Sequence, residues 1–302
     1  MPTTKPVIRR KAAVLAGFDL AFASPDGVTA LTASGGSTTT LIDAGTAPPN
    51  GYSTETHRNW HIYRPADPAA DQVRVVSSYS GALRQWTIPT GENWTAPTSS
   101  TGYLVLRDHP HEWETGLALA LTQKCFFVRY TEFDPTSETQ SRYALTSAPI
   151  SIPTADITSV AQFVALEYRD ENEVAGEEQW KTYWGRWEVV EDEGTFTLDT
   201  FGRHLNTART WRLVYTLPYS ALSDEVTTSN VNPDYAAWAT LLTMGERLGD
   251  RNNNDDRWEQ IRRDASQKYD EYHRRALGKY VGRVVIQPQV RRPGVSVLGR
   301  RG

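Results

Sequence analysis

The sequence contains a single cysteine, Cys125, among its 302 residues. One cysteine excludes an internal disulfide framework. The surrounding stretch, LTQKCFFV, is mostly apolar, so we expect Cys125 to be a small core residue. Apolar runs long enough to cross a membrane are also missing, because proline, glycine or a charged residue interrupts each run within a few positions. We therefore expect a protein without disulfides and without membrane association.

The sequence also lacks the motifs of common catalytic sites. It has no Gly-x-Ser-x-Gly nucleophile turn. Gly81, Gly91 and Gly102 are isolated, so they do not form a phosphate-binding loop. Adjacent carboxylates such as Glu177-Glu178 lie in polar, turn-like surroundings, whereas glycoside hydrolysis needs two carboxylates in a cleft. We therefore expect no enzyme activity and no cofactor.

The stretch nearest to a metal cluster is HPHEWE, residues 109–114. Imidazole and carboxylate groups are suitable metal ligands. However, Pro110 separates His109 from His111 at a predicted helix start, and carboxylates are favoured there by the helix dipole. No second cluster accompanies this stretch, so we predict no metal site.

The N-terminal residues resemble a signal peptide only in part. Lys5, Arg9, Arg10 and Lys11 precede the apolar stretch AAVLAGFDLAFA. Asp19 interrupts that stretch, and no clean cleavage site follows it. We predict a helix over residues 6–23 instead, ended by turn residues.

Hydrophobic residues make up 39% of the chain, which is enough for a packed core. Short alternating stretches bounded by turn residues recur about every ten residues, a pattern typical of small antiparallel barrels or sandwiches. They predict one β module at 27–130, closed by a helix over 110–124, and a second at 156–231. The polar, proline-containing segment 131–155 is interpreted as a hinge between them.

A helical hairpin is predicted over residues 232–277. Asn232 is a suitable N-cap, with Pro233 directly after it. Aromatic and leucine side chains then recur at helical spacing, and Asn252-Asn253-Asn254 interrupts the pattern before a second amphipathic helix. The predicted fold class is therefore α+β: two small antiparallel β modules, a C-terminal antiparallel helical hairpin and an extended C-terminal tail. The segments before and after these modules are an N-terminal arm, 1–26, and the tail, 278–302.

Charge is distributed unevenly along the chain. Residues 1–11 carry +4 and residues 279–302 carry +6, which leaves −14 for residues 12–278 out of a net −4. Basic ends on an acidic body favour docking on acidic neighbours. The tail also has strand-like apolar runs that Pro288 and Pro293 interrupt. Such a segment can add a strand to a partner's sheet edge. Nucleic acid is an alternative partner, although the tail lacks the interleaved aromatics of single-strand binders.

The order of these features resembles neck proteins of tailed-bacteriophage virions. The stretches that carry the resemblance are ASGGSTTTLID, WHIYRP, DQVRVVSSYSGALRQWTI, YLVLRDHPHEWETGLALALTQ, ITSVAQFVALEY, WEVVEDEGTFTLD and WRLVYTLPYSALSDE. Together with the helix predicted from Pro233, they cover roughly residues 28–277. The resemblance implies a head–tail connector, or adaptor, that forms a homo-oligomeric ring, of twelve copies in that family, beneath the portal protein. The large β content departs from the smallest adaptors, which are mostly helical.

That resemblance implies roles for two sets of residues. The tail residues expected to dock on the portal are Val284, Val285, Ile286, Arg291, Arg292, Val295, Val297, Leu298, Arg300 and Arg301. The hairpin residues expected to make ring contacts are Tyr235, Trp238, Arg247, Trp258, Arg262 and Tyr269. The other implied partners are a neighbouring neck or tail protein and DNA, which passes through the channel without sequence-specific binding. The implied location is the virion neck, after synthesis in the host cytoplasm.

One cluster supports an alternative function. Trp180, Tyr183, Trp184 and Trp187 form an aromatic group that could stack on sugars, as in a carbohydrate- or receptor-binding module of a tail or baseplate. We favour a packed core with interface aromatics, because aromatics dominate both. An unrecognised hydrolase and a nucleic-acid-binding assembly factor also remain open, as do the stopper, tail-terminator and baseplate positions.

Overall fold

The computed structural model describes residues 2–17, 31–45, 57–64, 72–99, 101–157, 159–170, 180–192, 194–223, 227–249 and 256–280. The chain divides into two compact units, and each is assembled from two separate stretches. Unit 1 comprises residues 1–126 and 218–275, and unit 2 comprises residues 127–217 and 276–302. No helix among the described residues is long and apolar enough to span a membrane.

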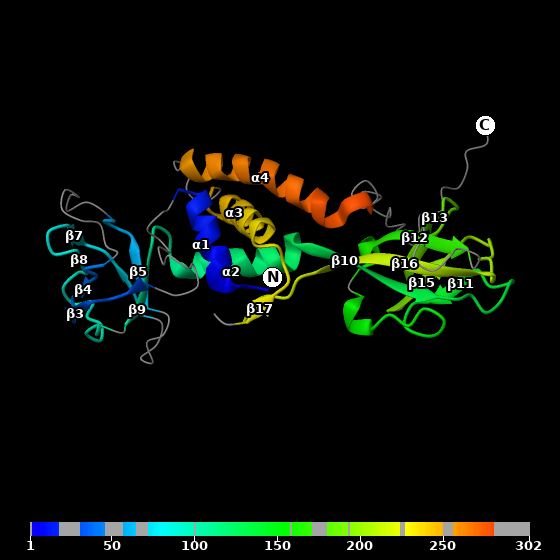
Figure 1. The fold of residues 1–302 in the computed structure, drawn as a ribbon, viewed down its shortest axis with the longest axis horizontal. Coiled ribbons are helices and arrows are strands. Elements are labelled where there is room, and N and C mark those ends of the chain that lie inside the picture. The colour runs from blue at the N-terminus through cyan, green and yellow to red at the C-terminus, as the bar shows by residue number, and fades with distance from the viewer. Residues whose placement is uncertain are drawn as a thin grey trace, which may run out of the picture. The chain divides into compact units, whose positions relative to one another are not determined.

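Four helices form the helical part of unit 1 (Figure 1). They are α1 (Lys5–Leu15), α2 (Pro110–Leu119), α3 (Pro233–Gly249) and α4 (Asp256–Leu277). Their apolar faces share one core, in which Trp113 and Trp258 are almost fully buried. Asn232 caps α3 as predicted, because its side-chain oxygen accepts hydrogen bonds from the backbone N–H groups of Asp234 and Tyr235.

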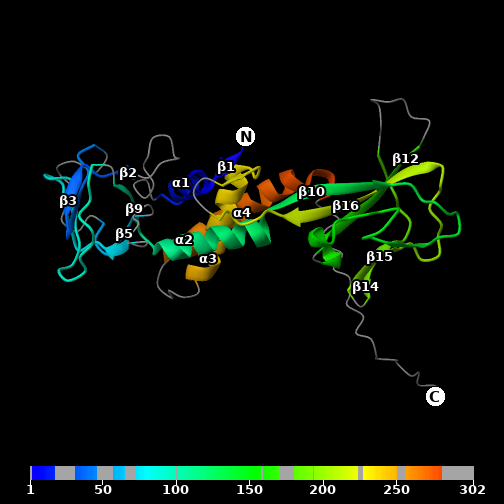
Figure 2. The same ribbon diagram turned by 90° about the horizontal axis from the view of Figure 1, so that it is seen from below.

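Helices α3 and α4 form the predicted antiparallel hairpin (Figure 2). Near the start of α3, the Tyr235 hydroxyl lies 2.7 Å from Nδ1 of His273, close to the end of α4. Further along α3, a Cβ added to Gly245 would come within 2.7 Å of the Arg262 Cβ. Partner numbers therefore fall along α4 as they rise along α3, which is the signature of antiparallel packing.

The β part of unit 1 consists of two four-stranded sheets. The first has the order β2 (Leu31–Thr32), β9 (Gly102–Leu106), β5 (His61–Arg64) and β6 (Gln72–Val75). The second has the order β3 (Gly35–Ser37), β4 (Thr40–Ile42), β8 (Gln85–Thr87) and β7 (Ser78–Ser80). Leu41, Ile62, Tyr79, Trp86 and Tyr103 are buried in a common core of these strands. A separate pair, β1 (Thr3–Thr4) and β17 (Thr228–Ser229), joins two distant parts of the unit.

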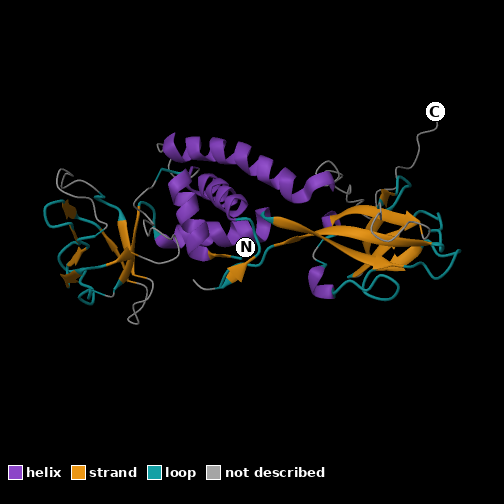
Figure 3. Ribbon diagram, viewed as in Figure 1, coloured by secondary structure: helices purple, strands orange, loops and turns teal. Residues whose placement is uncertain are grey.

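Unit 2 is built mostly of strands (Figure 3). One sheet has the order β10 (Phe126–Phe133), β16 (Arg209–Pro218), β12 (Phe163–Asp170) and β13 (Lys181–Thr182). The other has the order β11 (Arg142–Ala144), β15 (Thr195–Asp199) and β14 (Glu188–Asp192). Leu166 and Trp211 of the first sheet share a core with Tyr143 and Leu198 of the second, so the two sheets form a small sandwich. The short helices are η2 (Thr154–Asp156), η3 (Val160–Gln162) and η4 (Gly278–Tyr280).

The predicted fold class is confirmed: small antiparallel sheets are combined with a helical hairpin. The linear order of modules does not describe how the chain packs, because the hairpin packs in one unit with α1 and α2. Segment 131–155, which we interpreted as a hinge, instead supplies Tyr143, Leu145, Ile150 and Ile152 to the core of unit 2. Polar residues and prolines at its turns obscured these alternate apolar positions in the sequence. The helix predicted over 6–23 ends at Leu15, and residues 18–23 lie outside the described residues.

Candidate assembly surfaces

The beginning of the predicted tail is fixed on unit 2. Tyr280, in η4, is only 8% exposed and packs against Val164, Ala165 and Val214. These three residues belong to β12 and β16, on the side of their sheet away from the sandwich core. The tail therefore starts at a defined point on the outer face of this sheet.

A buried ion pair lies beside Tyr280. The Glu167 side chain is fully buried, and its Oε2 lies 2.6 Å from Nη2 and 2.8 Å from Nε of Arg212. The Tyr280 hydroxyl donates to the same oxygen at 3.2 Å. The Arg212 guanidinium also lies over the rings of Trp180, at 4.1 Å, and Tyr130, at 5.0 Å. A buried carboxylate needs such partners, because an uncompensated charge in the interior is very costly.

The rest of the tail, with all ten residues expected to dock on a portal, lies beyond Tyr280 and outside the described residues. These residues are Val284, Val285, Ile286, Arg291, Arg292, Val295, Val297, Leu298, Arg300 and Arg301. Docking by these residues stays a prediction.

Some of the residues expected to make ring contacts belong to the interior of unit 1. Trp258 is fully buried and Tyr235 is 2% exposed, so these two side chains pack within their own chain. Trp238 and Tyr269 are half-buried against the same helical packing. Helical periodicity identifies which residues share a face, but it does not reveal whether that face meets this chain or another. The ring contact itself stays a prediction.

The two arginines of that set lie nearer the surface, and both are paired within the chain. Arg247 Nη2 lies 2.8 Å from Oε2 of Glu112 on α2, and Arg262 Nη2 lies 2.8 Å from Glu259 on α4. Further along α4, the side chains of Arg263 and Arg275 are 75% and 66% exposed. The outer face of α4 is therefore a charged surface that is open to a neighbouring molecule.

A tyrosine–histidine cluster fastens this hairpin to the end of α2. The helix continues as a π-helical turn, η1 (Ala120–Lys124), whose last carbonyl oxygen accepts hydrogen bonds from the hydroxyls of Tyr235 at 2.8 Å and Tyr269 at 2.9 Å. Burial raises the pKa of Tyr269 to about 12, and it lowers the pKa of His273 below its usual value. Both groups therefore stay uncharged at neutral pH. This cluster could not be predicted from the sequence, because η1 lies more than 100 residues before the hairpin.

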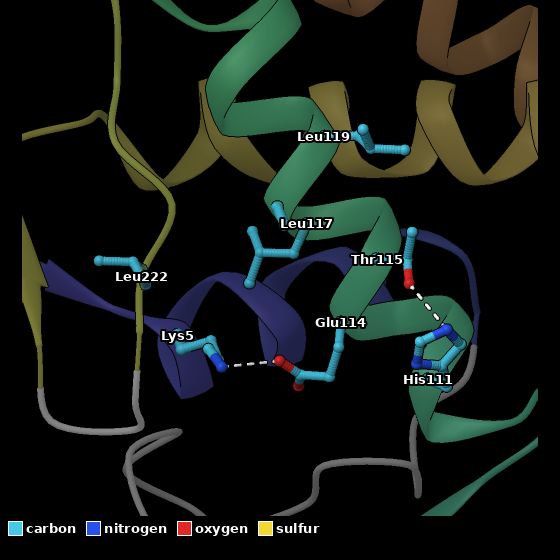
Figure 4. A pocket seen from close by; sticks show the side chains of 8 residues that line it. Lys5, His111, Glu114, Thr115, Leu117, Leu119 and Leu222 are labelled. Atoms are coloured by element: carbon cyan, nitrogen blue, oxygen red, sulfur yellow. Dashed lines mark hydrogen bonds and ion pairs between the residues drawn. The ribbon is translucent and has the colours of Figure 1, made fainter.

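A pocket of about 340 Å³ opens between α1, α2 and the segment around Leu222 (Figure 4). Its apolar wall includes Leu117, Leu119 and Leu222. Its polar groups are already engaged: Lys5 Nζ pairs with Glu114 at 2.7 Å, and the His111 ring faces the Thr115 hydroxyl at 3.4 Å. The pocket thus offers an apolar surface for a side chain, with a paired charge at its border.

The residues of the HPHEWE stretch cap the start of α2 and form ion pairs with neighbouring helices. The His109 ring accepts a hydrogen bond from the His111 backbone N–H, while Glu112 pairs with Arg247. Glu114 pairs with Lys5 and with Arg9. Among the residues that the structure describes, no group of three or more histidine, cysteine or acidic side chains could hold a metal ion.

The aromatic cluster divides between core and surface. Tyr183 and Trp187 pack against the sandwich core, whereas Trp184 between them is 85% exposed. Two residues after Trp184, the Arg186 guanidinium lies 3.9 Å from the ring of Phe201, a residue held at φ +53°. A bulky residue in this backbone region is strained, and such strain is often found at binding sites. The favoured core interpretation therefore fits Tyr183 and Trp187 but not Trp184.

Comparison with known proteins does not assign this chain to a family. No protein-family model matches the chain, and no curated protein matches it. One solved structure that matches is described as "Neck of empty GTA particle computed with C6 symmetry". It is 19% identical, with a TM-score of 0.21, and the match covers 46% of this chain and 64% of that chain. A TM-score this low establishes neither a shared fold nor a shared function.

Three features among the described residues are candidates for contact with another macromolecule. They are the anchored start of the tail at Tyr280, the charged outer face of α4, and the exposed side chain of Trp184. The first two lie in segments for which docking or ring contacts were predicted from the sequence. The third belongs to the aromatic cluster that supports the alternative function, a carbohydrate- or receptor-binding module. Phe201 and Arg186 were missed, because only the tertiary structure brings them together.

Proposed function

We propose that this chain is a structural virion protein of the head–tail neck. It acts as an adaptor that forms a homo-oligomeric ring between the portal and the tail, through which DNA passes without sequence-specific contacts. Its neighbours are the portal protein and another neck or tail protein, and it joins the virion after synthesis in the host cytoplasm. The proposal assigns the chain no reaction and no cofactor.

The anchored root of the tail carries this proposal. A segment that only solubilises the protein needs no fixed origin, whereas a docking segment gains affinity when its start is held in place. Tyr280 provides that fixed origin through its packing and its bond to Glu167. The residues that follow contain no acidic side chain, while residues 12–278 carry a net charge of −14. This arrangement suits a tail that reaches from one acidic body to another component.

In a closed ring, modest lateral contacts between subunits are enough to stabilise the assembly. Each subunit in a ring has two neighbours, so weak lateral contacts add up over the assembly. The exposed arginines of α4, such as Arg263 and Arg275, alternate with acidic residues that they partner within the helix. We assign the lateral contacts to this outer face of α4, since Tyr235 and Trp258 are buried in the chain's own core.

The decisive experiment is a chain that ends at Tyr280, without residues 281–302, expressed during particle assembly. The truncation point follows Tyr280 because this residue belongs to the fold of unit 2. We expect a folded protein that no longer joins particles, measured by immunoblot of purified virions. A matched control replaces residues 281–302 with a glycine–serine segment of equal length, and we expect it to fail equally. Incorporation of the truncated chain at the full-length level would refute the proposed docking.

Location within the particle is the complementary test. Gold-labelled antibody against the full-length chain should mark the head–tail junction in electron micrographs. A label at the distal tail tip would instead support a baseplate or receptor-binding role. Absence of label from particles would refute a virion function altogether.

One observation favours a second candidate, a carbohydrate- or receptor-binding module. Trp184 is 85% exposed on unit 2, and an exposed indole ring offers a large flat surface for stacking on a sugar or on a partner's side chain. The test is a glycan array with the intact chain and with Trp184→Ala. Leu83→Ala is the matched control, since Leu83 is 63% exposed on unit 1. Binding that Trp184→Ala abolishes and Leu83→Ala preserves would favour this candidate over the adaptor.

A further inference from the structure

The strand β14 has an open edge. In the order β11–β15–β14 it is the last strand, and within the described residues it pairs with β15 alone. The helix η3 contacts β14, but no backbone hydrogen bond joins the two among the residues described. An edge of this kind presents a row of unpaired N–H and C=O groups, which a further strand can satisfy.

The two faces of β14 differ in chemistry. Val189 points into the sandwich core and is 8% exposed, while Val190 on the opposite face is 37% exposed. Glu188 and Asp192 share the face of Val190, because alternate residues of a strand point the same way. Both are exposed, so the outer face consists of one valine between two carboxylates.

The tail contains a segment with the complementary pattern. Residues 281–287, VGRVVIQ, lie outside the described residues, and they contain no proline and no acidic side chain. As a strand, Arg283 and Val285 would share one face, and Val284 and Ile286 would share the other. The next residue, Pro288, cannot donate to a ladder and would end the pairing.

We propose that residues 281–287 of one copy add a strand to the β14 edge of a neighbouring copy. This inference rests on the proposed ring-forming function and names one partner for the tail within it. With Val285 beside Val190, Arg283 meets Asp192 in an antiparallel pairing or Glu188 in a parallel one, so either direction gives an opposite-charge pair. On the other face, Ile286 or Val284 then extends the core at Val189. Residues 288–302 remain for the portal.

The position of the tail root favours the neighbouring copy over the same one. Tyr280 lies on the outer face of the β10–β16–β12–β13 sheet, away from the sandwich core, and Val281 follows it directly. The strand β14 belongs to the other sheet of the sandwich. Packed sheets are about 10 Å apart, so the first residues of the segment would have to cross that distance before the segment could pair with its own β14. The edge of a second copy can accept the whole segment.

Disulfide cross-linking tests this pairing in the full-length protein. One preparation carries Val190→Cys, and a second, with a different tag, carries Val285→Cys. Val284→Cys is the matched control, because it lies one position along the segment and on the opposite face. The native Cys125 does not interfere, since it is buried and burial raises the pKa of its thiol. After mixing and mild oxidation, we expect mixed-tag dimers at least about tenfold more abundant with Val285→Cys than with the control, because a disulfide requires Cα atoms within about 7 Å.

A charge exchange provides the second measurement. The double substitution Glu188→Lys and Asp192→Lys should weaken self-association in sedimentation velocity, and Arg283→Glu in the same chain should restore it. Equal cross-linking by Val284→Cys and Val285→Cys would overturn the proposed register and pairing. A third preparation carries Val190→Cys and Val285→Cys in one chain. If a disulfide forms within this chain but not between the two singly substituted chains, the assignment to a neighbouring copy is wrong.

Failure of this inference is distinguishable from failure of the proposed function. Cross-linking is measured on the purified protein, whereas the proposed function is tested in particles. If no mixed dimer forms but the chain ending at Tyr280 is still excluded from virions, the tail docks elsewhere and only the β14 pairing is wrong. If that truncated chain joins virions normally, the neck docking is wrong whatever the cross-linking shows.

Discussion

Each unit contains a buried polar residue whose hydrogen-bond partners come from other segments of the chain. In unit 2, Glu167 is fully buried and depends on Arg212 and Tyr280 for its partners. In unit 1, His57 accepts a hydrogen bond from Nε1 of Trp86 at 3.0 Å within an aromatic core. Buried groups such as these are costly when a partner is lost, so single substitutions at these sites should have large effects.

Replacing Glu167 should destabilise unit 2 strongly. Glu167→Ala leaves the Arg212 guanidinium, whose side chain is 12% exposed, without its carboxylate. We expect the free energy of unfolding to fall by about 3 kcal/mol, the scale for breaking one partner of a buried pair. Urea denaturation followed by tryptophan fluorescence measures this. The control Glu188→Ala, on an exposed position of β14, should change stability by less than about 0.5 kcal/mol. Similar losses for both variants would contradict the assigned role of Glu167.

The stability of unit 1 should depend on pH through His57. Burial lowers the pKa of His57 to about 4 from an ordinary value of 6.5. Between these values the unfolded chain binds a proton that the folded chain does not, so stability is complete above pH 6.5 and falls as the pH drops towards 4. The shift corresponds to about 3 kcal/mol over that range.

The variant His57→Asn isolates this effect. Asparagine can still accept the hydrogen bond from Trp86, and it tolerates the positive φ of 59° at this position. We expect the decline in stability between pH 6.5 and 4 to be smaller in the variant, as measured by urea denaturation at a series of pH values. An unchanged slope would show that His57 is not the titrating group.

At the scale of elements, α3 packs closely against α4 and α2 at two glycine residues. At Gly245, α3 approaches α4 so closely that an added Cβ would lie 2.7 Å from the Arg262 Cβ and 3.1 Å from its Cα. Gly116 similarly allows α2 to approach Met244 of α3, with 2.6 Å from an added Cβ to the Met244 Cγ. Small residues at these crossings let the helix backbones come together, which ridges of larger side chains would prevent.

Gly245→Ala should therefore loosen the hairpin. Because the clash involves backbone and Cβ atoms of α4, the helices must separate, and we expect a loss of about 1–3 kcal/mol, as for overpacked cores. The matched control is Gly249→Ala in the same helix, where the nearest atom to an added Cβ is 3.9 Å away. Alanine there should be neutral or stabilising, because it has the higher helix propensity. Thermal unfolding followed by circular dichroism compares the two, and equal melting temperatures would refute the close-packing argument.

At the scale of the whole molecule, the chain crosses between its two units three times. Unit 1 contains residues 1–126 and 218–275, so the hairpin packs with α1 and α2 although residues 127–217 of unit 2 lie between them in sequence. The last described element, η4, then completes unit 2 with Tyr280. The fold of unit 2 therefore depends on residues from near the C-terminal end of the chain.

Two truncations should separate folding from docking. A chain ending at Tyr280 should match the full-length protein in stability, because the fold keeps its last core residue. A chain ending at Gly278 loses the burial of Tyr280, so we expect unit 2 to be less stable by about 2 kcal/mol, the scale for one large apolar side chain. Urea denaturation of both chains measures the difference. A loss of stability already present in the chain that ends at Tyr280 would mean that residues 281–302 belong to the fold.

The sequence by itself determined the features that depend on neighbouring residues. Asn232 and Pro233 predicted the start of α3 because an N-cap needs only its own side chain and the next few backbone N–H groups. Alternating stretches with turns predicted small antiparallel sheets for the same reason. Helical periodicity correctly grouped Tyr235, Trp258 and Tyr269 on apolar faces, and these faces meet inside unit 1.

Only the tertiary structure decided which distant residues meet. It assigned segment 131–155 to a core, buried Trp258 within unit 1, and left Trp184 exposed while its neighbours Tyr183 and Trp187 pack inwards. It also brought Glu167, Arg212 and Tyr280 together from three separate segments. Burial and ion pairing depend on contacts between residues far apart in sequence, and no local pattern encodes those contacts.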